Sequence, residues 1–410
     1  MKLLRGETVP PGLEPDEVRD RLLAGFQYIL VDEYQDIDEP QYQLISALAG
    51  RTLDDPDQKL AILAVGDDDQ NIYTFRGANV AFIRRFQQDY AADVHYLVEN
   101  YRSTRCIIEA SNQLIAANTD RMKTDHPICI DRHRSRLPAG GAWTERDPVT
   151  RGRVRVIQVP DSLAQAAAVI AALRRLREGG IADWSAIAVL SRGHEDLLRV
   201  RALAEQAGIP VRWWESRHQL PPLHRLREIH RFLGELAQQR QGLVRATDLV
   251  ARAEARYTDC PANPWAAFLR RTLEAWVTES DDAELPVQEA LEFLYESCAE
   301  SRRDLSYGEG VTLSTVHAAK GTEHDHVILI GRWPLKGDVR AQEEERRVFY
   351  VGMTRARHSL TVLEPADVAP SLPASLDGPS VYRERASPRH PTSNRPPSTV
   401  MKCSRSRTST

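Results

Sequence analysis

The sequence predicts an α/β protein built on parallel sheets, with a mostly helical segment inserted into its second half. Over residues 16–214, short apolar runs alternate with helical patterns, which is typical of βαβ units. Residues 223–301 contain helical patterns without strand signals, which indicates an inserted subdomain. The strand and helix alternation returns over residues 310–365, so the second α/β domain is predicted to be discontinuous.

The first α/β segment contains two predicted strands and two predicted helices. A helical spacing over residues 16–27 precedes the apolar run "YILVDE", residues 28–33. The stretch "EPQYQLISALAG", residues 39–50, is predicted to form a helix that ends at its glycine, and "KLAILAVGD", residues 59–67, a second buried strand. Both strands end in acidic residues, at the position where open α/β sheets gather their ligands.

The second α/β segment begins with the predicted strand "HYLVENYRS", residues 95–103, and the helix "RCIIEASNQLIAAN". After a polar loop come the strand "RVRVIQVPD", an alanine-rich helix, the strand "WSAIAVLSR", a further helix and "IPVRWW". After residue 365 the composition changes to proline, serine and arginine, which predicts a disordered tail. The predicted boundaries are 1–95 and 96–215 for the first two segments, 216–305 for the helical insertion, 306–365 for the returning α/β segment, and 366–410 for the tail.

The composition limits the classes of partner. The chain has 410 residues and a formal net charge of -4, which argues against a uniformly basic coat and leaves room for a local basic groove. Its five cysteines are widely spaced and form no CxxC pair, as expected for reduced thiols. No apolar run approaches the roughly 18 residues of a membrane span. We therefore expect a cytoplasmic protein without a membrane partner.

Asp32 and Glu33 are the first candidate site residues. An aspartate at a strand end can hold magnesium through oxygen, and a neighbouring glutamate can deprotonate an attacking water. A solvated turn or helix N-terminus accounts for the same two acids equally well.

The second acidic strand end continues as "DDDQNIYTFRGAN". Gln70 can hydrogen-bond a phosphate or a water, while Tyr73, Phe75 and Arg76 can stack on bases and hold a phosphate. The alternative is an aspartate-rich turn followed by aromatic side chains that pack in a core.

Five stretches taken together resemble a known family. "VDEYQD", "VGDDDQNIYTFRGA", "ENYRST", "VTLSTVHAAKGTEHDHVILIG" and "EEERRVFYVGMTRAR" are similar, in this order, to motifs II to VI of the UvrD-like superfamily 1 DNA helicases. The resemblance covers residues 26–363. It implies RecA-like motor domains, the first represented by its second half, with the helical insertion corresponding to the family's 2B subdomain.

The resemblance assigns a role to each matching residue at the ATP site. Asp32 matches the magnesium-binding aspartate, Glu33 the catalytic base and Gln70 the γ-phosphate sensor. Arg102 and Arg355 match two arginines that neutralise charge on the transferring phosphoryl group, work that suits planar and always charged guanidinium groups.

Further matches concern the nucleoside and the DNA. Tyr101 matches an adenine-stacking tyrosine and Glu323 a ribose-contacting glutamate, with Gly321 kept beside it. The implied cofactors are ATP and Mg²⁺, and the implied partners are single-stranded DNA and duplex junctions. The positions that match the family's single-stranded DNA path are Tyr73, Phe75, Arg76, Thr315 and His317.

The sequence departs from the family in one main respect. No GxxxxGK[ST] string, the P-loop that cradles the phosphates, occurs in it. Two functional hypotheses follow. The first is part of an ATP-dependent 3′ to 5′ DNA helicase or translocase that is weak or inactive alone, with the P-loop on a missing N-terminal segment or a second chain. The alternative is a non-catalytic module that binds single-stranded DNA or a protein.

Overall fold

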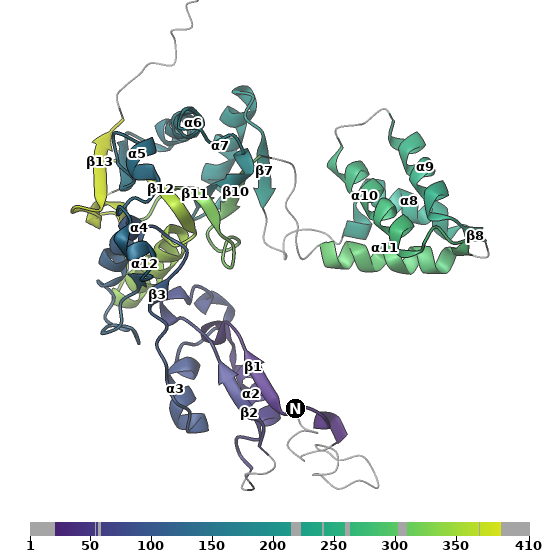
Figure 1. Cartoon of the computed structure of the whole chain (residues 1–410), viewed down its shortest axis with the longest axis horizontal. Helices are drawn as coiled ribbons and strands as arrows, with labels where there is room; N and C mark the ends of the chain where they lie inside the picture. Colours follow the sequence, from purple (N-terminus) through teal and green to yellow (C-terminus); the bar gives the residue numbers. More distant parts are fainter. Residues whose placement is uncertain are drawn as a thin grey trace, which may run out of the picture.

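The computed structural model describes residues 21–386, apart from 54, 56–58, 215–222, 240–241, 259–262, 302–309 and 369. The described chain forms three units, and in Figure 1 the unit with the large sheet contains colours from both before and after those of the helical unit. We call them the N-terminal unit (residues 21–91), the sheet unit (residues 99–214 and 310–386) and the helical unit (residues 223–301). The α/β prediction is confirmed by the parallel sheets of the first two units.

The N-terminal unit is built on two parallel strands, β1 (Tyr28–Val31) and β2 (Ala61–Ala64). The helix between them, α2 (Glu39–Ala49), begins with a capping box in which Asp38 and Gln41 satisfy each other's backbone N–H groups. It ends at Gly50, whose φ of 68° suits a residue without a side chain. A further helix, α3 (Ala81–Tyr90), completes the unit.

The two faces of the β1–β2 pair differ in burial. Val31 and Ala64 pack on a small core that α2 and α3 help to form. On the other face, apolar side chains are largely exposed; they are Tyr28, Leu30, Leu63 and Val65. Parallel sheets normally have both faces covered, so this face is unusual among parallel sheets.

The sheet unit contains seven parallel strands in the order β13-β5-β12-β11-β6-β10-β7. In chain order the strands are β5 (Val154–Val159), β6 (Ile187–Ser191), β7 (Val211–Trp214), β10 (Val311–Thr315), β11 (His324–Ile330), β12 (Ala356–Pro365) and β13 (Val381–Arg385). The strands on the two sides of the helical unit lie next to each other, because β10 pairs with both β6 and β7. The helical segment is therefore an insertion into one continuous sheet, as its composition predicts.

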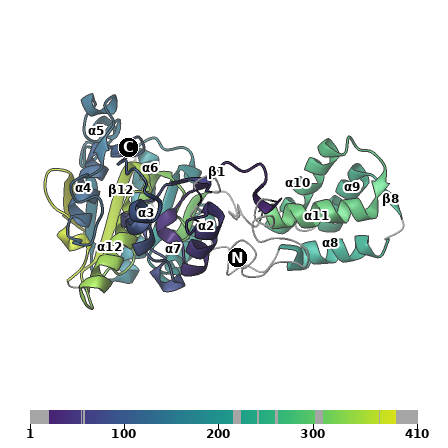
Figure 2. The ribbon, with the colours of Figure 1, turned by 90° about the horizontal axis from the view of Figure 1, so that it is seen from below.

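Helices cover both faces of this sheet, as Figures 1 and 2 show. One core contains side chains of α4 (Arg105–Ile115) and α12 (Val339–Met353), and the other those of α6 (Ser162–Glu178) and α7 (His194–Gln206). Strand β11 alternates between them, with Val327 and Leu329 in the first core and Ile328 and Ile330 in the second. A short helix, α5 (Trp143–Arg146), precedes β5.

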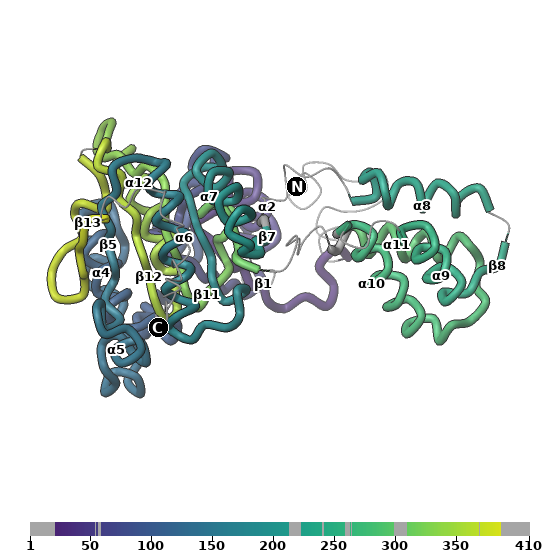
Figure 3. The backbone as a smooth tube through the Cα atoms, turned by 90° about the horizontal axis from the view of Figure 1, so that it is seen from above, coloured from purple at the N-terminus to yellow at the C-terminus, as the bar shows by residue number. Residues whose placement is uncertain are grey.

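The helical unit has its own core and lies beside the sheet unit, as Figure 3 shows. Its helices are α8 (Arg227–Ala237), α9 (Ala246–Tyr257), α10 (Pro264–Glu279) and α11 (Val287–Ser301). The expectation that this region contains no strand is wrong in one detail. Two-residue strands, β8 (Leu243–Val244) and β9 (Leu285–Pro286), form an antiparallel pair at its edge.

Two further predictions need correction. The strand expected over residues 95–103 is reduced to β3 (Glu99–Asn100), which pairs with β4 (Cys129–Ile130) outside the large sheet. The tail predicted from residue 366 is not disordered as far as residue 386, because β13 pairs with β5 along its whole length. The polar composition suggested disorder because β13 is an edge strand, in which few side chains are buried. The rest of that predicted tail, from residue 387, lies outside the described residues.

Two expectations drawn from composition can be compared with the described residues. There, no helix is both long and apolar enough to cross a bilayer. Cys106, Cys129 and Cys298 are free thiols. Cys260 and Cys403 lie outside the described residues.

A truncation tests the role of residues 366–386. Leu372, Leu376 and Val381 are buried against the sheet. A chain that ends at Pro365 should lose about 5 kcal/mol of unfolding free energy relative to a chain that ends at residue 386, because three buried apolar side chains are removed. Denaturant unfolding followed by circular dichroism measures this difference, and equal midpoints for the two chains would show that β13 is dispensable.

Candidate functional site

Asp32 and Glu33 lie in the turn that follows β1, and Glu33 has an unusual backbone. Its φ of 52° places a non-glycine residue in the left-handed region, which costs about 1 kcal/mol. The backbone N–H of Glu33 donates to Asp32 Oδ1 (2.9 Å), and Gln35 Nε2 donates to Glu33 Oε2 (2.5 Å). Non-glycine residues in this backbone region cluster at active sites and ligand-binding sites, so the conformation is consistent with Glu33 as a candidate site residue.

Gln35 connects the ends of the two strands. Its side chain is fully buried, and its Oε1 accepts a hydrogen bond from the backbone N–H of Asp67 (2.9 Å) after β2. A Cβ at Gly66 would lie 2.6 Å from the same oxygen, so any larger residue there would displace the Gln35 side chain. The acidic turns after β1 and β2 are therefore fixed relative to each other, as their positions at one sheet edge predict.

Gln70 lies where the N-terminal unit meets the sheet unit. Its Nε2 donates to Asp67 Oδ2 (2.9 Å), while its Oε1 accepts from Arg355 Nη2 (3.2 Å). Arg355 lies between α12 and β12 and is 2 % exposed. Burial, and then the positive charge of Arg102, lower the pKa of Arg355 to about 10, so the guanidinium stays charged at neutral pH. Gln70 and Arg355, which the family resemblance assigns to one ATP site, are therefore in direct contact.

Lys320 also crosses this junction, and the sequence reasoning missed it. Its side chain is 6 % exposed, and its Nζ lies 3.2 Å from Glu33 Oε2 and donates to Gln70 O (2.8 Å) and to Asp36 Oδ2. Burial raises the pKa of Asp36, and the charge of Lys320 opposes that rise. The available signal was a lysine inside the apolar stretch "VHAAKG", where a charged residue needs a partner.

Arg102 and Glu323 form an ion pair within the sheet unit. Arg102 Nη2 donates to Glu323 Oε1 (2.8 Å), and Arg357 Nε donates to Glu323 Oε2 (2.8 Å). The hydrogen bond from Arg102, followed by that from Arg357, lowers the pKa of Glu323 to about 2. Arg102 Nη1 also donates to Thr354 O (3.3 Å), next to Arg355. The structure therefore places Arg102, Glu323 and Arg355 close together.

Tyr101 and Gly321 border this group. The Tyr101 ring is 70 % exposed, with its hydroxyl donating to Glu99 Oε2 (2.6 Å), so the ring presents a free face. Gly321 has a φ of 83°, which disfavours any side chain there. The nucleoside-binding candidates are thus exposed, whereas the candidate phosphate-contacting residue Arg355 is buried.

The candidate DNA-contacting residues form a cluster across the same junction. Tyr73 donates its hydroxyl to His317 O (2.9 Å), and the Phe75 and His317 rings lie 5.6 Å apart. The guanidinium of Arg76 lies over the rings of Tyr73 (5.2 Å) and Phe75 (5.5 Å). Phe75 is 69 % exposed, so part of this aromatic surface is open. Burial lowers the pKa of His317 to about 4, and the ring is neutral near pH 7.

Thr315 differs from the other DNA candidates. It is 7 % exposed, and its Oγ1 accepts from the backbone N–H of Ala318 (3.2 Å). The hydroxyl therefore closes the turn after β10 and contributes little open surface.

The acidic triplet before Gln70 is held by basic residues that the sequence reasoning did not single out. Arg121 donates to both oxygens of Asp69 (2.8 Å each), and Lys123 Nζ lies 2.6 Å from Asp67 Oδ1. Asp68 accepts from the backbone N–H of Met122 (2.7 Å), and burial raises its pKa. The three carboxylates are close enough to suggest a metal site, but these contacts already compensate them. They join the two units instead.

Asp32 suits magnesium better than this triplet does. Its carboxylate is exposed and its Oδ1 accepts only a backbone N–H among the described contacts. Magnesium is commonly held by one or two carboxylates together with waters and substrate phosphates. Asp32 therefore fits as a single oxygen ligand, with the remaining positions open to water and nucleotide.

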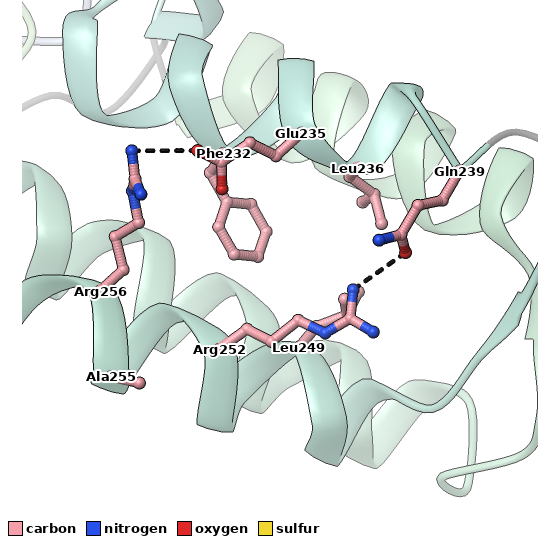
Figure 4. A pocket seen from close by; sticks show the side chains of 8 residues that line it. All are labelled: Phe232, Glu235, Leu236, Gln239, Leu249, Arg252, Ala255 and Arg256. Atoms are coloured by element: carbon pink, nitrogen blue, oxygen red, sulfur yellow. Dashed lines mark hydrogen bonds and ion pairs between the residues drawn. The ribbon is translucent and has the colours of Figure 1, made fainter.

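A pocket in the helical unit contains none of the predicted site residues. It lies between α8 and α9 over Phe232, Leu236 and Leu249. Figure 4 shows its rim closed by two polar contacts, Arg256 with Glu235 (2.9 Å) and Arg252 with Gln239 (3.0 Å). It offers no convergent catalytic groups.

The ionisation of Glu323 gives a testable prediction. Arg102→Ala should raise the pKa of Glu323 from about 2 toward its ordinary value of 4.5, and Arg357→Ala should raise it less. Because ionised Glu323 is stabilised in the fold, its contribution is complete above pH 4.5 and is lost as pH falls toward 2. Carboxyl-carbon NMR titration measures the pKa, and an unchanged value in Arg102→Ala would contradict the pairing.

Comparisons with known proteins identify related domains and relatives. Residues 4–91 match the UvrD/REP helicase N-terminal domain, and residues 270–364 match the UvrD-like helicase C-terminal domain. DNA helicase II of Haemophilus influenzae is 44% identical over 105 residues, 26% of this chain and 14% of that protein. DNA helicase II of Escherichia coli is 28% identical over 82% of this chain and 55% of its own length. The ATP-dependent DNA helicase PcrA of Leuconostoc citreum is 28% identical over 84% of this chain and 55% of its own.

The extent of these matches limits what they show. The chain spans about half the length of the E. coli and L. citreum relatives. A solved C-terminal domain of a possible DNA helicase from Lactobacillus plantarum covers 69% of this chain and 98% of its own, at 13% identity and a TM-score of 0.32, which is too low to support an argument. The two domain matches and the long alignments agree with the five motifs and their order. The chain therefore contains regions that match both the N-terminal and the C-terminal domain of the UvrD-like helicases.

Proposed function

We propose that this chain is part of an ATP-dependent DNA helicase or translocase that moves 3′ to 5′ on single-stranded DNA. The observation that carries the proposal is the junction where Glu33 and Gln70 of the N-terminal unit meet Arg355 and Lys320 of the sheet unit. A base, a polar sensor and buried cations from two units are the components that phosphoryl transfer between two motor domains requires.

Each group has a role in this proposal. Glu33 orients and deprotonates the attacking water, Asp32 holds the Mg²⁺ that ATP brings, and Gln70 contacts the γ-phosphate. Arg355 and Arg102 stabilise charge on the transferring group. When bound, Mg²⁺ neutralises charge on the phosphates.

Movement of the junction couples hydrolysis to DNA. Lys320 and His317 lie three residues apart on the segment after β10, so one turn contacts both Glu33 and the aromatic cluster. A change in the separation of the two units moves Tyr73 and Phe75 relative to His317. Stacking contacts read every base alike, so we expect no sequence specificity.

The proposed site is completed by a further polypeptide segment. We propose that a polypeptide segment carrying a P-loop packs on the exposed face of the β1–β2 pair. Tyr28 and Leu30 are 68 % and 75 % exposed on that face, and Leu63 and Val65 extend it. Without the phosphate cradle we expect the chain alone to bind ATP weakly and to hydrolyse it slowly or not at all.

Single-stranded DNA binding tests the aromatic cluster without requiring ATP. Phe75→Ala should weaken binding of a fluorescent oligothymidine by about 1–3 kcal/mol, because a stacking face is removed. Tyr295→Ala, which removes a 46 % exposed ring on α11, is the matched control and should leave affinity unchanged. Fluorescence anisotropy at fixed salt measures both, and equal affinities for Phe75→Ala and the unaltered chain would argue against this DNA path.

Complementation tests the catalytic assignment. Co-expression with the part of E. coli DNA helicase II that precedes its aligned region should raise DNA-stimulated ATP hydrolysis above that of either piece. Glu33→Gln should abolish the gain while retaining DNA binding, because it removes the base and leaves the aromatic cluster intact. Glu39→Gln, at the exposed start of α2, is the control. DNA binding without any complemented hydrolysis would favour the non-catalytic binding module.

A further inference from the structure

The loop that carries Tyr101 and Arg102 contacts an ion pair, Asp131 with Arg134, that no motif predicts. Asp131 and Arg134 lie in the turn after β4, with Asp131 2 % exposed. Asp131 Oδ1 accepts from the backbone N–H groups of His133 (3.0 Å) and Arg134 (3.1 Å), and Asp131 Oδ2 accepts from Arg134 Nε. The buried carboxylate of Asp131 therefore fixes the orientation of the Arg134 guanidinium.

The rest of this guanidinium contacts the loop. Arg134 Nη2 donates to Asn100 O (2.5 Å), and Arg134 Nη1 donates to Arg102 O (3.3 Å) and Ser103 O (3.2 Å). Three carbonyl groups of one four-residue loop therefore share a single side chain. Lysine cannot reproduce this arrangement, because its ammonium lacks a planar set of donors.

Two backbone N–H groups of the same loop donate to a side chain within it, and the serine hydroxyl donates to β12. Asn100 Oδ1 accepts from the backbone N–H groups of Arg102 (2.9 Å) and Ser103 (2.8 Å). Ser103 Oγ donates to Ala356 O (2.7 Å), which fixes the end of the loop to β12. The loop is consequently held between β12 on one side and Arg134 on the other.

We propose that Arg134 is a positioning residue for Tyr101 and Arg102, acting through the carbonyl groups on either side of them. The inference rests on the proposed function, since Tyr101 and Arg102 are the residues that would contact the nucleotide. By fixing the backbone at residues 100, 102 and 103, Arg134 holds the Arg102 side chain toward Glu323 and Thr354 O. Asp131 balances the charge of Arg134, so the loop gains rigidity with little added positive charge.

The test compares variants of the full chain. Arg134→Ala removes all the loop contacts, Arg134→Lys keeps the charge, and Asp131→Asn keeps the guanidinium but loosens its anchor. Arg136→Ala is the matched control, because Arg136 is an exposed arginine in the same turn without a hydrogen bond or ion pair in the described part of the chain. If Arg134→Ala does not fold, Arg134→Lys and Asp131→Asn test the same loop contacts.

Two measurements separate positioning from general stability. Amide hydrogen exchange in the peptide 99–104 should accelerate roughly tenfold in Arg134→Ala, less in the two milder variants and not at all in Arg136→Ala. ATP binding by equilibrium dialysis, measured with the complementing piece of E. coli DNA helicase II present, should weaken roughly tenfold in Arg134→Ala. Exchange in the α6 peptide, far along the sequence, should be unchanged in every variant.

The combination of exchange and ATP-binding results distinguishes the positioning role of Arg134 from the proposed function. Unchanged exchange at residues 99–104 overturns the positioning role, whatever happens to ATP. Faster exchange with undiminished ATP binding also overturns it, because the ordered loop would then not serve the nucleotide. Faster exchange in a chain whose unaltered form binds no ATP even with the complementing piece present supports the role of Arg134 on the loop and counts against the proposed function instead.

Discussion

The buried contact of Arg355 with Gln70 is the interaction on which the arrangement of the site depends. Burying a guanidinium is costly unless its donors are satisfied, and this one donates to Gln70 and to the backbone carbonyls of Val351 and Thr322. Lys320 repeats the pattern beside it, with Glu33 and Asp36 as its partners. Because the N-terminal unit supplies part of each set, a separation of the two units would break these contacts and expose both cations to water.

The sequence predicts the parts of this site that come from strand ends. Asp32, Glu33 and Gln70 follow apolar runs, and their position at one sheet edge follows from the parallel α/β pattern alone. Lys320, Arg121 and Arg134 could not be assigned in this way, because their partners lie far away in the sequence. Lys320 contacts Asp36, 284 positions before it, and nothing local in either segment signals the pairing. Local patterns predict which side chains are candidates, and only the fold shows which candidates meet.

The two sheets differ in how their faces are buried, and the sequence did not show this difference. In the seven-stranded sheet, β11 runs between two cores and its apolar side chains are buried on both faces. In the N-terminal unit, β1 and β2 are equally apolar, yet one face carries exposed aromatic and aliphatic side chains. Sequence patterning therefore predicted both strands, but its expectation that they are buried is wrong, because their residues alternate between exposed and half-buried. A patch of this kind is usual where another polypeptide packs.

The position of Glu33 imposes an order on events in the proposed reaction. Its Oε2 accepts from Gln35 and lies 3.2 Å from Lys320 Nζ, so this oxygen is already engaged by two partners. Gln70 is similarly engaged by Arg355. Both groups would have to exchange these partners for water and phosphate before they act. Lys320 belongs to the turn that carries His317 beside Phe75. A DNA strand entering the aromatic cluster would therefore act on the same turn that holds Glu33, which gives a physical route by which DNA releases the base.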